Sequence, residues 1–90
     1  MTRTELATAG DALEAAAEGA DDPAAAERLE TLAGQLHDLA EAAEGPDHGR
    51  LARIQAALNE VEGDVSETVA GQIEDADDEI NAYRETLEGV

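Results

Sequence analysis

The fold class is indicated by residues 22–46, which read DPAAAERLETLAGQLHDLAEAAEGP. Asp22 is a good N-cap, and Pro23 suits the first helical position, where its missing N–H costs no hydrogen bond. Gly45-Pro46 would end the segment, because neither residue continues a helix well. Between these signals the apolar residues are spaced alternately by four and three positions, which is typical of helices that pack side by side. These apolar positions are Ala25, Leu29, Leu32, Leu36, Leu39 and Ala43.

A similar helical segment precedes this one. It runs from about Arg3 to Glu18, and Gly19 supplies its C-terminal stop. Thr2 and Glu5 fit a capping box, in which the hydroxyl and the carboxylate each satisfy a free backbone N–H. The apolar positions of this segment are Leu6, Ala9, Leu13, Ala16 and Ala20.

Two more segments follow the Gly45-Pro46 stop. Asp47 is the predicted cap of the third, and Gly63 interrupts its apolar pattern. Asp64 with Glu67 resembles another N-terminal box, which favours a break at Gly63-Asp64. The alternative is one helix of about 41 residues, roughly 60 Å long, since a single Gly costs only about 1 kcal/mol. The apolar positions of the two segments are Leu51, Ile54, Leu58 and Val61, then Val65, Val69, Ile73, Ala76, Ile80, Tyr83 and Leu87.

These patterns predict an all-α fold. We expect a single helical domain over residues 1–90, built as a small bundle of three or four helices with short loops punctuated by Gly, Pro and Asp. Sixteen Leu, Ile and Val residues make a small core for a chain of 90 residues. Small cores are often completed by association. A homodimer and a compact monomer are therefore both open.

The charge is extreme for so short a chain. There are 23 acidic residues against five arginines and no lysine, and the formal net charge is −18. Disordered acidic tails share this balance, but 42% of these residues are apolar and recur at helical spacing, which favours a folded chain. Dense carboxylates repel one another in dilute buffer, whereas at 1 M salt the Debye length falls to about 3 Å. We interpret the composition as adaptation to molar salt.

The same composition limits the compartments in which we expect the protein and the partners that we expect it to bind. Without cysteine, the chain can form neither a disulfide framework nor a thiolate metal site. No apolar run approaches transmembrane length, and residues 1–5 lack the apolar stretch of a signal peptide, so we expect a cytoplasmic protein. The negative charge would be repelled by nucleic acids and anionic membranes, so we expect neither as a partner.

The inventory of catalytic groups is poor. The chain has no Cys or Lys, no glycine-rich phosphate loop and no Glu-x-x-His metal motif, so we expect neither an enzyme nor a cofactor or metal site. Heptad counting points His37 outward beside Glu30, Glu41 and Glu44, where it could bind a divalent cation weakly. A solvated surface is the favoured interpretation. The acidic run at residues 74–79 lacks the Gly and Glu that a calcium loop needs.

One stretch is unusual in this acidic chain. Asp47, His48, Arg50 and Arg53 place two of the five arginines and one of the two histidines at a helix N-terminus. Cations there oppose the helix dipole. Together with the free N–H groups of the helix, these cationic side chains could bind an anion, such as a phosphate or a partner's carboxylate. The favoured alternative is local pairing, of Arg50 with Asp47 and of Arg53 with a carboxylate on a neighbouring helix.

Two segments carry a family resemblance. Residues 45–54, GPDHGRLARI, and residues 80–90, INAYRETLEGV, resemble an uncharacterised family of small acidic helical proteins from haloarchaea. The resemblance runs the length of the chain and implies a salt-adapted cytoplasmic protein. It implies no catalytic or binding residue.

The function that these patterns favour is binding. We expect a non-catalytic helical module for protein interaction or self-association. The alternative is a small regulatory or anion-binding protein that uses the helix N-terminus at residues 47–53.

Overall fold

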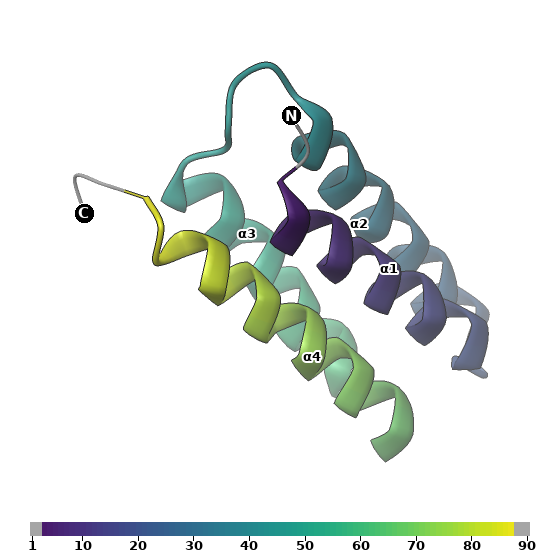
Figure 1. The fold of residues 1–90 in the computed structure, drawn as a ribbon. Helices are drawn as coiled ribbons and strands as arrows, with labels where there is room; N and C mark the ends of the chain where they lie inside the picture. Colours follow the sequence, from purple (N-terminus) through teal and green to yellow (C-terminus); the bar gives the residue numbers. More distant parts are fainter. Residues whose placement is uncertain (1–2, 88–90) are drawn as a thin grey trace.

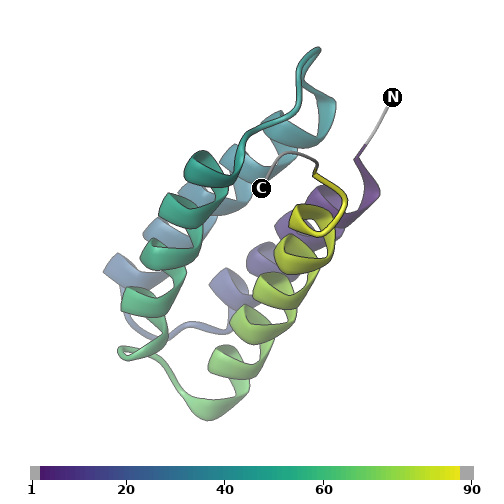
Figure 2. The ribbon, with the colours of Figure 1, turned by 90° about the vertical axis from the view of Figure 1, so that its left-hand side faces the viewer.

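The computed structural model describes residues 3–87, which contain four α-helices in an antiparallel bundle (Figure 1). Helix α1 spans Thr4–Gly19, α2 Pro23–Glu41, α3 His48–Glu62 and α4 Glu67–Arg84. Consecutive helices run in opposite directions, and α4 returns beside α1, so the four helices surround one core (Figure 2). The Cα atoms extend over 38 × 22 × 16 Å. The predicted all-α bundle is confirmed, and the described part of the chain has four helices rather than three.

Helices α3 and α4 are separate and are joined by residues 63–66. The predicted break at Gly63-Asp64 is therefore confirmed. The predicted cap is wrong, because α4 is capped by Ser66, whose hydroxyl accepts a hydrogen bond from the N–H of Val69 at 3.3 Å. Asp64 instead lies in the turn between the helices.

The start of α1 differs from its prediction. Its N-cap is Arg3, which makes no side-chain cap, and Thr2 of the expected capping box lies outside the described residues. Arg3 instead binds the end of α2: its N–H donates to the carbonyl of Ala40 at 2.9 Å. Its Nη1 donates to the carbonyls of Leu39 at 3.0 Å and Ala42 at 2.7 Å. Because the last carbonyls of a helix lack helical partners, Arg3 satisfies them and places a positive charge at the negative end of the dipole.

The apolar positions of all four helices meet in the core. Helix α2 ends at Glu41, earlier than its apolar pattern predicts, and Ala43 is exposed while Leu39 is half-buried. No charged or polar residue in 3–87 is buried. None of the helices in this range is long and apolar enough to cross a membrane. The largest fully buried side chains are Leu6, Leu13, Leu29, Leu36, Leu51, Leu58, Val69, Ile73 and Ile80.

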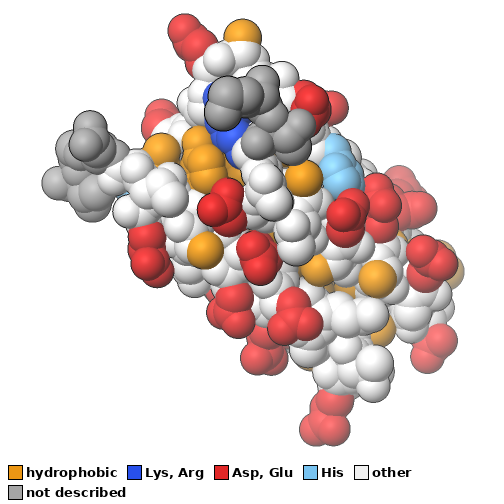
Figure 3. Space-filling model, viewed as in Figure 1, with side chains coloured by type: hydrophobic (Ala, Val, Ile, Leu, Met, Phe, Trp, Pro, Cys, Tyr) orange, Lys and Arg blue, Asp and Glu red, His pale blue; other side chains and the backbone are white. Residues whose placement is uncertain are grey.

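The helices pack unequally. Helix α1 packs closely against α2 and α4, using small buried residues such as Ala9, Gly10 and Ala16. Of the four helix pairs that are in contact, α2 and α3 approach each other least, although they are neighbours in sequence. Acidic side chains are scattered over the face seen in Figure 3. Three of the five arginines lie on the open side of the bundle, between α2 and α3.

Candidate functional site

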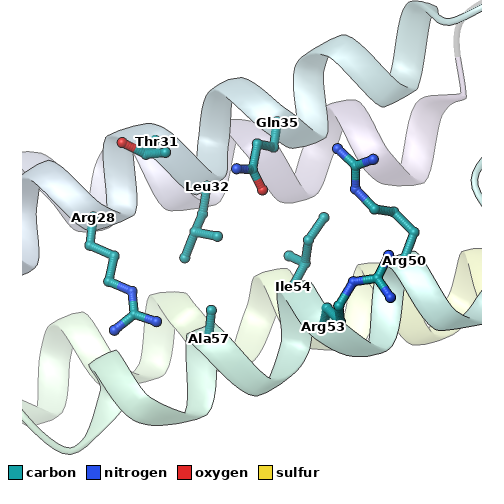
Figure 4. Close-up of a pocket in the computed structure, with 8 residues that line it drawn as sticks. All are labelled: Arg28, Thr31, Leu32, Gln35, Arg50, Arg53, Ile54 and Ala57. Carbon is teal, nitrogen blue, oxygen red and sulfur yellow. The ribbon is translucent and has the colours of Figure 1, made fainter.

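A groove of about 530 Å³ lies between α2 and α3 (Figure 4). It exists because these two helices diverge and leave their facing side chains only partly covered. Each helix contributes four lining residues. From α2 these are Arg28, Thr31, Leu32 and Gln35, and from α3 they are Arg50, Arg53, Ile54 and Ala57.

Three of the five arginines of the chain line this groove. Arg28 lies at one end, and Arg50 and Arg53 lie at the other (Figure 4). Between them Leu32 and Ile54 form an apolar floor that is 6% and 3% exposed. The groove therefore offers two separated cationic ends with an apolar centre, on a chain whose net charge is −18.

The side chains of Arg50 and Arg53 have no hydrogen bond or ion pair with any residue in 3–87. The expected pairing of Arg50 with Asp47 is absent, because the Asp47 carboxylate accepts the backbone N–H of Arg50 instead, at 2.8 Å. The expected pairing of Arg53 with a neighbouring carboxylate is absent as well. No residue in this part of the chain therefore keeps either guanidinium group from a ligand.

Arg28 at the other end of the groove is already paired. Its Nη2 lies 3.1 Å from Oε1 of Glu60, and the two side chains are 47% and 67% exposed. Exposed pairs of this kind contribute only about 0–1 kcal/mol to stability. An incoming carboxylate can therefore replace Glu60 at little cost.

His48 lies next to the groove residues in sequence but faces α4. Its Nδ1 accepts a hydrogen bond from Nε of Arg84 at 3.1 Å, while its Nε2 is buried without a hydrogen-bond partner among the described residues. Arg84 also donates to Oε1 of Gln55 at 2.6 Å. Gln55 in turn donates to Asp77 at 2.8 Å and Asn81 at 2.9 Å. This network joins α3 to α4.

The structure thus divides the four residues that the sequence singled out. Arg50 and Arg53 meet in the groove, whereas Asp47 caps α3 and His48 joins the contact with α4. Sequence reasoning missed Arg28. The predicted hairpin of two helices could have indicated it. Because the chain turns back at the Gly45-Pro46 loop, the start of α2, where Arg28 lies, comes beside the end of α3.

The second histidine, His37, also has an orientation that differs from the predicted one. His37 was expected to face solvent beside Glu30, Glu41 and Glu44. Its ring turns toward α1 instead, where it lies beside Asp11 and Glu14.

Residues 1–86 match the profile of a family described as a family of unknown function, DUF7553. Comparison with curated proteins and comparison with solved structures both gave no match.

Proposed function

Since the chain belongs to DUF7553, a family of unknown function, we propose a function from its groove: it is a non-catalytic interaction module that binds an acidic amphipathic helix of a partner protein. The partner's helix lies in the groove between α2 and α3. The observation that carries the proposal is the gathering of three arginines at the two ends of one apolar-floored groove.

Charge complementarity supports an acidic partner. Guanidinium groups present planar forks of donors that fit carboxylates, and pairs of this kind are among the stronger hydrogen bonds. Arg50 and Arg53 have no competing carboxylate among the described residues, and Arg28 has only the exposed Glu60. Carboxylates at both ends of a partner segment would satisfy all three.

The apolar floor supports a helix rather than a small anion. A phosphate held by Arg50 and Arg53 would make no use of Leu32 and Ile54. A phosphate would also meet the Asp47 carboxylate, which already accepts the Arg50 N–H at the start of α3. An amphipathic helix can set apolar side chains on the floor and acidic ones at the ends, as in other helix-in-groove complexes.

A second copy of the chain is a less suitable occupant. Each described helix buries its apolar face in the shared core of one chain, against the helices on either side of it. A folded second copy could offer an apolar helix face only by opening its own core. The burial of all four apolar faces favours a monomer that binds another protein over the homodimer left open by the sequence.

The test is a titration in molar KCl, where the fold is expected to be intact. The isotopically labelled chain is titrated with a synthetic helical peptide that has a leucine seam and glutamates at both ends, and amide NMR signals are followed. We expect saturable shifts at the groove residues. The double variant Arg50→Gln/Arg53→Gln should weaken binding by at least roughly tenfold, because each charged hydrogen bond contributes about 1.5–3 kcal/mol.

The matched control is Ala15→Glu/Thr68→Glu, which changes the net charge equally at exposed positions of α1 and α4 outside the groove. It should bind the peptide as the unmodified chain does. Equal weakening in both variants, or no saturable shift, would refute the proposal. Saturation by inorganic phosphate alone, lost in the arginine variant, would favour the anion-binding alternative.

A further inference from the structure

A second cluster of polar side chains lies between α1 and α2, away from the groove. Asp11 and Glu14 are three positions apart in α1, so they lie on the same face of the helix. His37 of α2 points its Nε2 toward both, at 3.4 Å from Oδ1 of Asp11 and 3.2 Å from Oε2 of Glu14. On the face seen in Figure 3, histidine atoms lie next to acidic side chains.

These separations match those between ligands of one metal ion. Ligand atoms about 2.0–2.1 Å from a zinc-like ion in a tetrahedral arrangement lie about 3.3 Å from one another. One ligand atom from each of Asp11, Glu14 and His37 can be chosen so that all lie within 4.8 Å of one another. The carboxylates are 72% and 58% exposed, so small rotations can bring them together.

The packing around the ring supports a built site. Gly10 lies directly under the ring of His37, and a Cβ there would come within 2.7 Å of Nε2 and 2.8 Å of Cδ2. A mid-helix glycine costs about 1 kcal/mol relative to alanine, so the space for the ring is gained at the expense of helix stability. Nε2 itself is buried yet lacks a hydrogen-bond partner of good geometry among the described residues. Such an atom is suited to a metal ion.

One side of the cluster is open. Glu14 also lines a hollow of about 440 Å³ between α1 and α2, together with Glu18, Glu30 and Gly34. Addition of a Cβ at Gly34 would meet no atom within 4 Å, so the space directly over Gly34 is open. The acidic hollow provides an entry path for a cation and room for water at the remaining coordination positions.

We propose that Asp11, Glu14 and His37 bind one divalent transition-metal ion between α1 and α2. One imidazole and two carboxylates suit Zn²⁺, Co²⁺ or Mn²⁺, whereas Mg²⁺ prefers an all-oxygen octahedral shell with several waters. The ion would join the two helices, so its binding should also raise the free energy of unfolding. This site shares no residue with the groove.

The test uses Co²⁺ as the probe, titrated in molar KCl so that diffuse attraction to the acidic surface is screened. Calorimetry should show one saturable Co²⁺ per chain. The paramagnetic ion should shift or broaden the ring signals of His37 and leave those of His48, the other histidine, nearly unaffected. His37→Gln and Asp11→Asn/Glu14→Gln should each weaken binding by at least roughly tenfold.

The matched control is Asp64→Asn/Glu67→Gln, which removes the same two residue types at the same spacing in an exposed region without a histidine. It should retain the binding of the unmodified chain. Circular dichroism checks that each variant is folded. Equal weakening in the control, several weak sites without saturation, or an unperturbed His37 ring would each overturn the proposal.

Discussion

The ring of His37 occupies the space that a side chain at Gly10 would need, since a Cβ on Gly10 would lie 2.7 Å from Nε2. The two residues belong to the closely packed pair α1 and α2. A glycine in the middle of a helix is unfavourable, but here it lets an imidazole lie directly on the neighbouring backbone. The contact also sets the ring beside Asp11 and Glu14.

Glycine-to-alanine substitutions should separate this contact from ordinary helix propensity. Gly34→Ala and Gly71→Ala should each raise the free energy of unfolding by about 0.5–1 kcal/mol, because a Cβ at either position meets open space. Gly10→Ala should give no such gain, because the His37 ring must move. Urea unfolding in molar KCl measures all three. A gain at Gly10 equal to that at Gly34 would show that the ring is free to shift.

The fold should depend strongly on salt. Within residues 3–87, Arg28 with Glu60 is the single arginine–carboxylate pair. Arg3 is bound to carbonyls and Arg84 to His48 and Gln55, and neither pairs with a carboxylate of the described residues. The excess of carboxylates makes the surface repel itself unless ions screen the charge.

We therefore expect the helical signal in far-ultraviolet circular dichroism to fall when the chain is moved from molar KCl to dilute buffer. It should return when salt is restored. A spectrum that is the same in both buffers would contradict the proposed adaptation to salt.

Arg3 should contribute more to stability than the groove arginines. Arg3→Gln removes the hydrogen bonds to Leu39 and Ala42, and hydrogen bonds from charged groups contribute about 1.5–3 kcal/mol each. We expect a loss of roughly 2 kcal/mol in the free energy of unfolding. Arg53→Gln is the matched control and should change it by less than about 0.5 kcal/mol, because Arg53 touches no described partner. Similar losses in both would mean that general charge, and not the end of α2, determines the effect.

Glu62 should make stability depend on pH. Partial burial raises the pKa of its carboxyl, and the neighbouring carboxylates of Glu74 and Asp77 raise it further. A group whose pKa is raised by folding stabilises the fold when protonated, and that contribution is lost as pH rises through the folded-state pKa. At neutral pH the charged Glu62 therefore opposes folding.

Glu62→Gln should consequently stabilise the chain at neutral pH by roughly 0.2–0.5 kcal/mol, the size of like-charge repulsion between neighbours on a helix surface. The advantage should shrink as pH falls toward the range where Glu62 takes up its proton. Thermal unfolding of both chains across acid to neutral pH tests this. A constant difference at every pH would exclude the carboxyl as its cause.

The helices and their boundaries were largely predictable because apolar spacing and breakers act locally. Gly63 ended α3 as expected. The cap of α4 was not predictable in the same way, because Asp64 and Ser66 are both good caps; the helix that starts after Ser66 has Val69 buried in the core. The local sequence permits more than one cap, and the packing of the core determines which one is used.

The orientation of side chains beside the apolar seam was harder to predict. Heptad counting treats each helix as having one buried face, which placed His37 outward. In this bundle a helix has two close neighbours, so a position next to Leu36 can face α1 instead of solvent. The gathering of Arg28 with Arg50 and Arg53 likewise depends on how far α2 and α3 diverge, which spacing along one helix does not specify.

The close packing of α1 against α4 has a consequence for synthesis of the chain. The ribosome makes α1 first and α4 last of the four helices, so part of the apolar face of α1 stays uncovered until residues 67–84 have emerged. Incomplete chains with exposed apolar surface are prone to aggregate. We expect the nascent chain to acquire its core only after α4 leaves the exit tunnel, and to be a ligand for chaperones until then.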